Sequence, residues 1–443
     1  MGMNRLIQQQ SLPQSTSVAL IDFSNAFNCV ERSCIIDEVF QHCPSLAAYV
    51  QYTYCCPARL YIGSEYIESQ KGVQQGDPLG PLLFSLALQP LLNQLKDVSA
   101  SVSPSSLLGA PAFLDDLSMA TTTPESVIAC YDFLHAEGPK RGLHISPAKS
   151  VVWMPFGPNH TLERLARARG LQVATGKGVR LLGGGLSIDP TFHAQIVMER
   201  AQKCATNIRT MMRLKDPQLC LLLLRSCFGM PQLTYSFRVA PPSALQEVTR
   251  LLETTLLDAL RWIMVDGTPL QFDAPFHLSL SSLPLRMGGL GITLPSDVGQ
   301  FAHIACDIST LSLQCMLFPT LSMSDGRLRP LCDKFLSSVG ITDRKKQRET
   351  RALILTSAHK TQFLMSDLLS RFKRLQLARH AYLHQWTPAR NILPQHSLLW
   401  ASYDVQPPPP RASPEDADLE APYPLHSQWL LAIPNPRLGQ KME

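Results

Sequence analysis

The sequence predicts an α+β protein in which a first half of strands and helices is followed by a largely α-helical second half. Before residue 190, short apolar runs bounded by polar or turn residues favour strands. After Phe192, apolar residues recur at helical spacing, most clearly over 219–224 and 251–260. With 443 residues, 45% hydrophobic and 17% charged, the chain is long enough for two or three domains, and disorder of the whole chain is excluded.

Two of the predicted strand regions carry carboxylates at their ends. The apolar run 18–21 ends at Asp22, which is consistent with a buried strand that delivers a carboxylate at its tip. Residues 112–120 predict two short strands with the pair Asp115-Asp116 at the hairpin turn between them.

Helices are predicted from periodic apolar residues and from their entry signals. Gly80-Pro81 opens a helical pattern over 79–95, and an amphipathic helix is expected over 126–137. The most apolar segment, 219–235, is broken by Arg225 and Pro231 and is expected to be a buried helix. The Ser/Pro-rich stretch 97–111 predicts a linker or exposed turn, and a further boundary is expected over 319–330.

Composition narrows the class of protein. The net charge of +5 permits an anionic partner without demanding one. No stretch of eighteen apolar residues lacks a charge, so no membrane span is expected, and residues 1–10 lack the apolar core of a signal peptide. We therefore expect an intracellular protein, with nucleus and cytoplasm both open. The twelve cysteines form no CxxC pair and no zinc-finger pattern, and are expected to be reduced, mostly buried small residues.

The carboxylates suggest a chemistry. An enzyme that joins nucleotides must stabilise charge on the attacking and leaving oxygens of a phosphoryl group, which two Mg²⁺ ions about 3.5–4 Å apart can do. These hard cations need converging carboxylate oxygens, and Asp22, Asp115 and Asp116 offer them from neighbouring strand ends. An Asp-Asp pair is also common in ordinary turns, so the carboxylates alone do not decide the matter.

Five ordered segments resemble the catalytic motifs of reverse transcriptases, in the style of non-LTR retrotransposon polymerases. The resemblance rests on Asp22-Phe23-Ser24-Asn25-Ala26-Phe27, on Gly72-Val73-Gln74-Gln75-Gly76-Asp77-Pro78-Leu79-Gly80-Pro81-Leu82-Leu83-Phe84, on Phe113-Leu114-Asp115-Asp116, on Gly142-Leu143-His144-Ile145-Ser146-Pro147-Ala148-Lys149 and on Leu181-Leu182-Gly183. The later segment 283–291, Leu-Pro-Leu-Arg-Met-Gly-Gly-Leu-Gly, also resembles non-LTR retrotransposon polymerases.

The resemblance implies a catalytic metal site in a palm-type antiparallel sheet. Asp22 and Asp115 would be the main ligands of two Mg²⁺ ions, with Mn²⁺ as an alternative. Asp116 would lie beside them, and the Phe23 carbonyl would complete the coordination shell. Lys149 would protonate the leaving pyrophosphate, although an isolated lysine is more often a solvated side chain.

It also implies contacts to nucleotide and primer. Phe27 would lie under the sugar and exclude a 2′-hydroxyl by bulk, with a packed core aromatic as the alternative. Gln75 and Gly76 would shape the pocket around the template base and incoming nucleotide. Leu182 and Gly183 would contact the primer.

The resemblance divides the chain into four parts. Residues 1–190 would form the palm, 191–318 a helical thumb-like domain, 319–405 a helical basic region and 406–443 a Pro-rich acidic tail that is disordered. Only 21 residues precede Asp22, so the fingers subdomain is expected to be largely missing, or to come from a partner chain.

The function implied is that of an RNA-directed DNA polymerase that uses an RNA template, a DNA primer and dNTPs. The alternative is a catalytically inactive, truncated relic that binds nucleic acid or protein. Two basic clusters could follow a phosphate backbone, or be solvated helix faces: Arg344-Lys345-Lys346-Gln347-Arg348, and Arg371, Lys373, Arg374 and Arg379. The first could instead be a nuclear-import signal.

Overall fold

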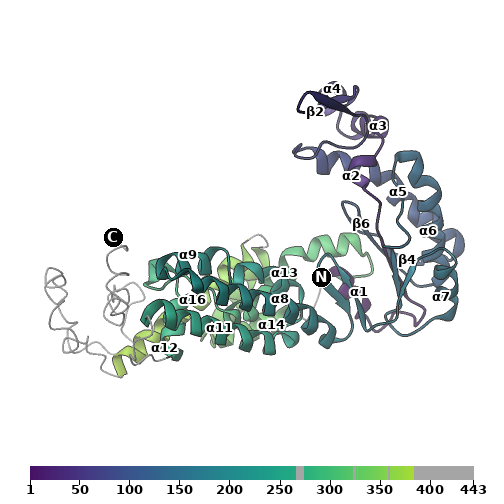
Figure 1. The fold of residues 1–443 in the computed structure, drawn as a ribbon. Coiled ribbons are helices and arrows are strands. Elements are labelled where there is room, and N and C mark those ends of the chain that lie inside the picture. The colour runs from purple at the N-terminus through teal and green to yellow at the C-terminus, as the bar shows by residue number, and fades with distance from the viewer. Residues whose placement is uncertain (266–273, 323–325, 327, 358–359, 384–443) are drawn as a thin grey trace. The chain divides into compact units, whose positions relative to one another are not determined.

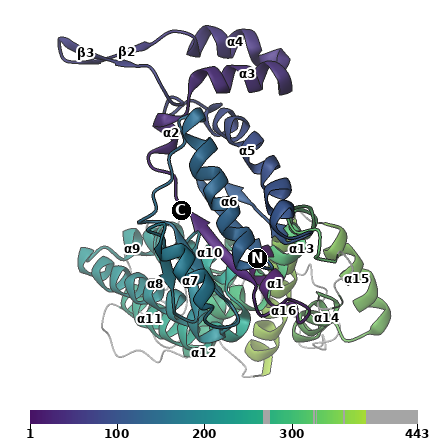
Figure 2. The ribbon, with the colours of Figure 1, turned by 90° about the vertical axis from the view of Figure 1, so that its right-hand side faces the viewer.

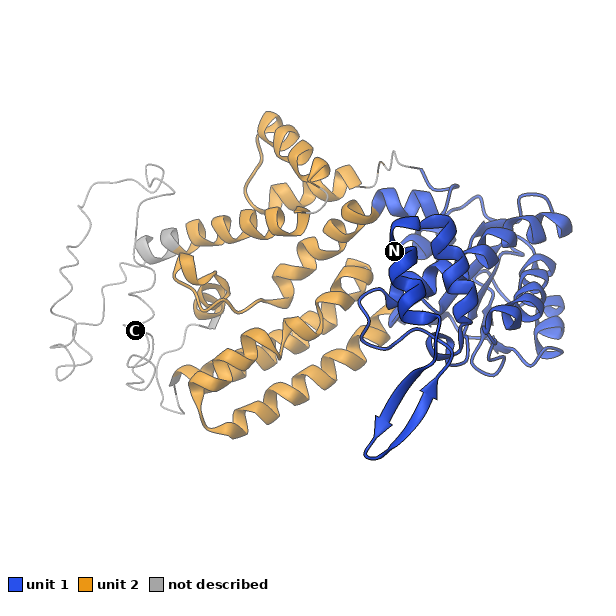
Figure 3. Ribbon diagram, turned by 90° about the horizontal axis from the view of Figure 1, so that it is seen from above, with its two compact units in different colours: residues 1–192, 311–323 blue, residues 193–310, 324–443 orange. Residues whose placement is uncertain are grey.

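The computed structural model describes residues 1–265, 274–322, 326, 328–357 and 360–383. The chain divides into two compact units, and each is described by itself (Figure 3). The first unit comprises residues 1–192 and 311–323, and the second comprises 193–310 and 324–443. The four-part division stays a prediction, and its tail, 406–443, lies outside the described residues.

A six-stranded sheet organises the first unit (Figure 1). Its strand order is β4-β6-β1-β7-β8, with β5 paired to β6. All pairs are antiparallel except β7 with β8. The strands are β1 (Ser17–Ile21), β4 (Leu107–Gly109), β5 (Ala112–Phe113), β6 (Asp116–Thr121), β7 (Val151–Trp153) and β8 (Gln172–Ala174). The mixed α+β class is as predicted, and so is the strand that ends before Asp22.

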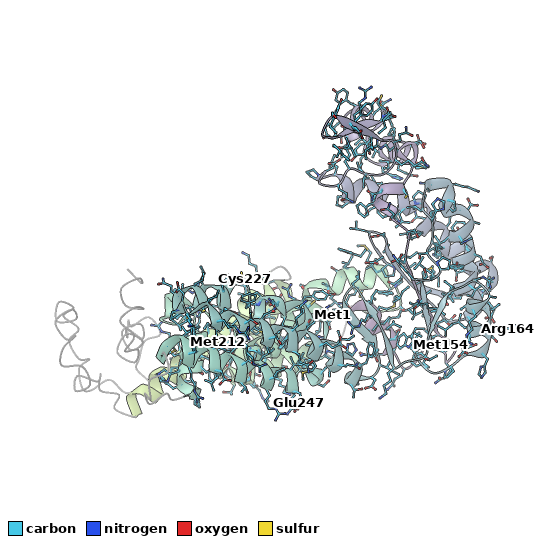
Figure 4. All side chains as sticks on the ribbon, viewed as in Figure 1. Met1, Met154, Arg164, Met212, Cys227 and Glu247 are labelled. Carbon is cyan, nitrogen blue, oxygen red and sulfur yellow. The ribbon has the colours of Figure 1, made fainter. Side chains whose placement is uncertain are left out.

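Helices cover one face of this sheet because alternate strand residues are apolar there. Ala19 and Ile21 of β1 and Leu117 and Met119 of β6 join one core cluster. Helices from the same part of the chain contribute to it: α2 (Ala26–Cys29), α3 (Arg32–His42), α4 (Pro44–Tyr54), α5 (Gly80–Val102), α6 (Pro124–Glu137) and α7 (His160–Arg167). Figure 4 labels Arg164 of α7 and Met154, which follows β7, in this unit.

The opposite face carries a second core cluster. Val18, Ala120 and Trp153 point into it and meet the helix α1 (Gly2–Ile7). The hairpin of β9 (Gly178–Leu181) and β10 (Gly184–Ser187) adds Val179 and Leu186. Phe318 packs here so closely that a Cβ on Gly109 would lie 2.5 Å from its ring. Segment 311–323 therefore completes the first unit although it lies far along the sequence.

A hairpin projects from the first unit (Figure 3). It consists of β2 (Ala58–Ile62) and β3 (Glu65–Ser69), which pair only with each other and are exposed over nearly their whole length. Arg32 anchors its base, since the guanidinium donates to the carbonyls of Ser69 (2.7 Å) and Gly72 (3.1 Å).

The second unit is helical throughout its described residues, as predicted. Its 3₁₀ turns are Met212–Leu214, Met230–Gln232, Pro242–Ala244 and Leu285–Met287. Its helices are α8 (Pro190–Met211), α9 (Pro217–Ser226), α10 (Thr234–Val239), α11 (Gln246–Val265), α12 (Ala274–Ser282), α13 (Pro295–Leu317), α14 (Leu328–Ser338), α15 (Arg344–Thr356) and α16 (Thr361–Leu383). The start of α8 and the end of α13 belong to the first unit.

One local prediction held only in part and another was wrong. Stretch 97–111 is not a linker, because α5 continues to Val102 and 107–109 form β4, and the exposed turn is confined to the residues between them, 103–106. Segment 219–235 is not one buried helix: α9 ends at Ser226, and Leu219 and Leu222 are 41% and 56% exposed. The Gly229 φ of 80° and Pro231 account for the break, because neither continues a helix.

All twelve cysteines are free. The prediction that most are buried holds only in part, because Cys130, Cys204, Cys220 and Cys332 are buried while Cys55, Cys56 and Cys227 are exposed. Among the helices of the described residues, none combines the length and the apolar character needed to cross a membrane.

Candidate nucleotidyl-transfer site

Three carboxylates gather at one edge of the main sheet. The register of β1 and β6 pairs Ile21 with Leu117, so the next residues outward, Asp22 and Asp116, follow the last cross-strand pair. Asp116 is also the partner of Phe113 in the short β5–β6 hairpin, and Asp115 lies in its turn. Leu114, in the same turn, has a φ of 57°. The sequence prediction that these carboxylates come from neighbouring strand ends is confirmed.

The carboxylates influence one another electrostatically. The pKa of Asp116 is raised, first by desolvation of its carboxyl group beside the folded chain and then by the negative charges of Asp115 and Asp22. Like charges this close disfavour the ionised form of a carboxyl group, and a cation between them would reverse the effect.

A loop that precedes β7 holds the backbone at Asp22 in place. The Asp22 N–H donates to the Ser150 hydroxyl oxygen (3.1 Å), and the Asp22 carbonyl accepts from the Ser146 N–H (2.8 Å). Ser150 is fully buried, and its hydroxyl donates in turn to the Ser146 carbonyl (2.8 Å). Phe23 forms a β-bridge with Ile145, which continues this connection. The end of β1 and the loop over 145–150, which are far apart in sequence, thus fix the backbone of Asp22 together.

Phe27, which the sequence predicts to lie under the sugar, is partly buried. Phe27 stacks on Phe84 of α5 with ring centroids 4.5 Å apart and an interplanar angle of 11°. Its carbonyl accepts a hydrogen bond from the Val73 N–H (2.9 Å). Phe23, in contrast, is 3% exposed and its side chain belongs to the core.

The turn that leads into α5 is fixed by a buried tyrosine. The Tyr54 hydroxyl donates to Asp77 Oδ2 (2.5 Å) and accepts from the Gln74 N–H (3.2 Å). Burial and the bond to Asp77 raise the pKa of Tyr54 to about 12. Gln75 and Gly76 are exposed at the tip of this turn, where Gly76 has a φ of 93° and open space around it.

Two glycines press against the chain that follows Asp22. A Cβ on Gly72 would lie 2.5 Å from the Phe27 carbonyl oxygen, and one on Gly142 would collide with the Cys29 carbonyl oxygen. Both have positive φ, 74° and 75°. Only glycine therefore fits both the backbone conformation and the space.

The remaining predicted residues lie in exposed positions. Lys149 is exposed in the turn before Ser150. Leu182 and Gly183 form the two-residue turn of the β9–β10 hairpin with φ values of 47° and 75°. No described contact joins these residues to the three carboxylates, so their assigned roles remain predictions.

The donors suit a hard divalent cation in chemistry, because carboxylate oxygens are the ligands that Mg²⁺ prefers. The raised pKa of Asp116 is consistent with a site that gains from added positive charge. Across the part of the chain that the structure describes, no three His, Cys, Asp or Glu side chains form a group already arranged to hold a metal. The donor chemistry fits, whereas a complete ligand shell is not preformed.

Sequence reasoning missed the residues that support the site. Ser150 and Tyr54 act through hydrogen bonds to residues distant in sequence, and neither shows a local pattern that could have identified it. Gly142 did carry a signal, as the first residue of a segment already singled out.

Comparison with known families places this site in context. Residues 2–186 match the family described as "Reverse transcriptase (RNA-dependent DNA polymerase)", and the match spans the whole sheet with its three carboxylates. The match ends at residue 186, before α8 begins at Pro190.

Two curated proteins are similar over shorter segments. The Retrovirus-related Pol polyprotein from type-1 retrotransposable element R2 of Nasonia vitripennis is 30% identical over 148 residues, which is 32% of this chain and 14% of that protein. The corresponding polyprotein from type-2 retrotransposable element R2DM of Drosophila melanogaster is 32% identical over 116 residues, 25% of this chain and 11% of that protein. The chain thus matches a small part of each relative.

Among solved structures, telomerase from Candida albicans, in complex with a fragment of telomeric RNA, has 10% identity and a TM-score of 0.33 over 81% of this chain and 51% of its own. Apo telomerase from Candida tropicalis has 9% identity and a TM-score of 0.34 over 90% and 55%.

Proposed function

We propose that this chain is an RNA-directed DNA polymerase of retroelement origin, which transfers a nucleotide from a dNTP to a primer 3′-hydroxyl on an RNA template. The observation that carries the proposal is the meeting of Asp22 with Asp115 and Asp116 at one sheet edge, inside the segment that matches the reverse transcriptase family.

The carboxylates would hold the metal ions of this reaction. Asp22 and Asp115 are the proposed main ligands, with Asp116 beside them and the Phe23 carbonyl as a further oxygen donor. Two Mg²⁺ ions, or Mn²⁺ in their place, would neutralise charge on the attacking and leaving oxygens. Ser150 would act as a positioning residue, because its hydroxyl holds the Asp22 backbone.

Other residues would bind and orient the substrates. The Phe27 ring, held by Phe84, is proposed to lie under the sugar, while Gln75 and Gly76 border the nucleotide and template base. Lys149, which is exposed, would donate a proton to the leaving pyrophosphate. Leu182 and Gly183 would contact the primer. The proposed domain roles are a palm for residues 1–190 and a thumb for 191–318.

Primer extension tests the proposal directly. Wild-type protein, Asp115→Asn and Asp97→Asn are incubated with an RNA template, a DNA primer, dNTPs and Mg²⁺. Asp97 is an exposed carboxylate on α5 of the same unit and serves as the matched control. We expect extension by the wild type and by Asp97→Asn and none by Asp115→Asn, with primer–template binding nearly equal in all three. Full extension by Asp115→Asn would overturn the proposal.

The second candidate is a catalytically inactive relic that binds nucleic acid or protein. A wild-type protein that binds primer–template but does not extend it, with either Mg²⁺ or Mn²⁺, would support this candidate over the polymerase.

A further inference from the structure

The first turn of α15 concentrates positive charge on the second unit. This helix lies beside α14 and α16 (Figure 2). Four of its first five residues are cationic and all four are exposed: Arg344, Lys345, Lys346 and Arg348. Within the described residues, none of the four makes an ion pair with a carboxylate of this chain.

Contacts on the other side of the helix hold this turn facing outward. Asp343 caps the helix by accepting from the Lys346 N–H (2.8 Å). The Gln347 amide donates to the Ser337 hydroxyl (3.0 Å) and to the Ile341 carbonyl (2.7 Å). Further along, Arg351 pairs with Asp333 of α14, and Ile354 is fully buried. The helix is therefore docked through one face, and its cations are left to solvent.

The second basic cluster of the sequence has a different fate. Arg371 pairs with Asp367 (2.8 Å), which also accepts from Arg286 (2.6 Å). Lys373 is mostly covered and pairs with the buried Asp297 (2.6 Å). Lys373 ties α16 to Asp297 of α13, and Asp367 ties it to Arg286, whereas the Arg371 pair lies within α16 itself. The two clusters look equivalent in sequence, but in the second cluster Arg371 and Lys373 are engaged with carboxylates, whereas among the described residues no cation of the first cluster is.

The position of the free cluster is electrostatically unfavourable within the chain itself. A helix N-terminus carries a partial positive charge, so cations there are disfavoured, while anions are stabilised. Asp343 and Glu349 offset only part of the excess charge. The four cations are exposed and form no ion pair among the described residues, which favours a role in meeting an external anion.

We propose that the first turn of α15 is a binding surface for the phosphate backbone of a nucleic acid. The four cations occupy positions i, i+1, i+2 and i+4 and so spread around the turn instead of converging on one point. A row of phosphates matches such a spread better than a single small anion does, and Lys and Arg contacts to phosphates need no base sequence. The surface lies outside residues 2–186, and it does not require the carboxylates of the first unit.

Salt-dependent binding tests this assignment with charge-matched variants. Affinity for a fluorescent RNA–DNA duplex is measured by anisotropy over a series of KCl concentrations. One variant carries Arg344→Gln and Arg348→Gln, and its control carries Arg286→Gln and Arg371→Gln, which removes the same charge from residues engaged with Asp367. A second variant, Lys345→Gln with Lys346→Gln, repeats the test on the other two cations.

The expected result is specific to α15. Each α15 variant should weaken binding, and the slope of log affinity against log salt should fall by about 2, or about 1 per lost phosphate contact. The control should keep the wild-type slope, and thermal unfolding should show that every variant is folded. Asp115→Asn should bind as the wild type does, so failure of polymerisation would leave this result intact.

Three outcomes would overturn the proposal. Unchanged binding in both α15 variants would mean a solvated helix face. An equal loss in the α15 variants and the control would mean that only net charge matters. Unchanged nucleic-acid affinity together with lost binding to an acidic import receptor would identify a protein-docking signal instead.

Discussion

The backbone N–H of Asp22 donates a hydrogen bond of 3.1 Å to the hydroxyl oxygen of Ser150, which lies 128 positions later in the chain. The same hydroxyl donates to the Ser146 carbonyl (2.8 Å). The backbone N–H of Ser146 in turn donates to the Asp22 carbonyl. The end of β1 is thereby fixed to the loop before β7, so the orientation of the Asp22 carboxylate depends on a buried serine.

Ser150→Ala should lower the free energy of unfolding by about 1–3 kcal/mol, because it leaves the partly buried Asp22 N–H without its acceptor. Urea denaturation measures the change. Ser85→Ala is the control, since the exposed Ser85 hydroxyl bonds only within α5 and its loss should cost less than about 0.5 kcal/mol. Equal losses in the two variants would contradict the positioning role. Primer extension should fall in Ser150→Ala alone.

The pKa of Asp116 should respond to its neighbours. Asp115→Asn or Asp22→Asn should each lower that pKa, which NMR titration of the carboxyl carbon can follow, because each removes a negative charge. A carboxyl group whose pKa is raised on folding binds more protons in the native state. Stability is therefore lost as the pH rises from the ordinary Asp range through the raised pKa.

Asp116→Asn should accordingly make the protein more stable than the wild type at pH 7, with the difference vanishing below the ordinary Asp pKa. Solvent screening of this exposed carboxylate limits the gain to less than about 1 kcal/mol. An unchanged Asp116 pKa in both neighbour variants would show that the three carboxylates are not coupled.

Gly142→Ala should destabilise the protein by more than about 2 kcal/mol, because the new Cβ would meet the Cys29 carbonyl oxygen in addition to the strain of its φ of 75°. Gly63→Ala is the matched control: its φ is 67°, but nothing lies within 4 Å of the added Cβ. That change should cost only the left-handed conformation, about 1–2 kcal/mol. Thermal unfolding measures the stability of both variants. Equal losses of stability in the two would show that crowding at Gly142 adds nothing.

Tyr54→Phe should cost about 1–3 kcal/mol, because it removes the partner of both Asp77 Oδ2 and the Gln74 N–H. Tyr52→Phe, on the same helix but 86% exposed, should be nearly neutral. Ultraviolet titration provides a second measurement: the component with a pKa of about 12 should disappear in Tyr54→Phe and persist in Tyr52→Phe. A component that persists in Tyr54→Phe would exclude Tyr54 as its source.

Local patterns were sufficient to predict much of the first unit. The apolar run before Asp22 became β1, and the Asp115-Asp116 pair lies at a hairpin between β5 and β6. These predictions held because strands and tight turns depend on residues within a few positions of one another. The linker predicted over 97–111 is reduced to a turn over 103–106. Ser and Pro are frequent in loops, but α5 continues through six of those residues and 107–109 pair with β6.

The sequence by itself determined the class of fold, the three carboxylates and the order of the motifs that carry them. Only the tertiary structure decided that Ser150 holds the backbone of Asp22 and that Tyr54 holds the turn at Asp77. It also decided that the cations of α15 face solvent, whereas Lys373 forms an ion pair with Asp297. The physical reason is range. Strand and turn propensities act between near neighbours, whereas buried hydrogen bonds and ion pairs join side chains that only the folded chain brings together.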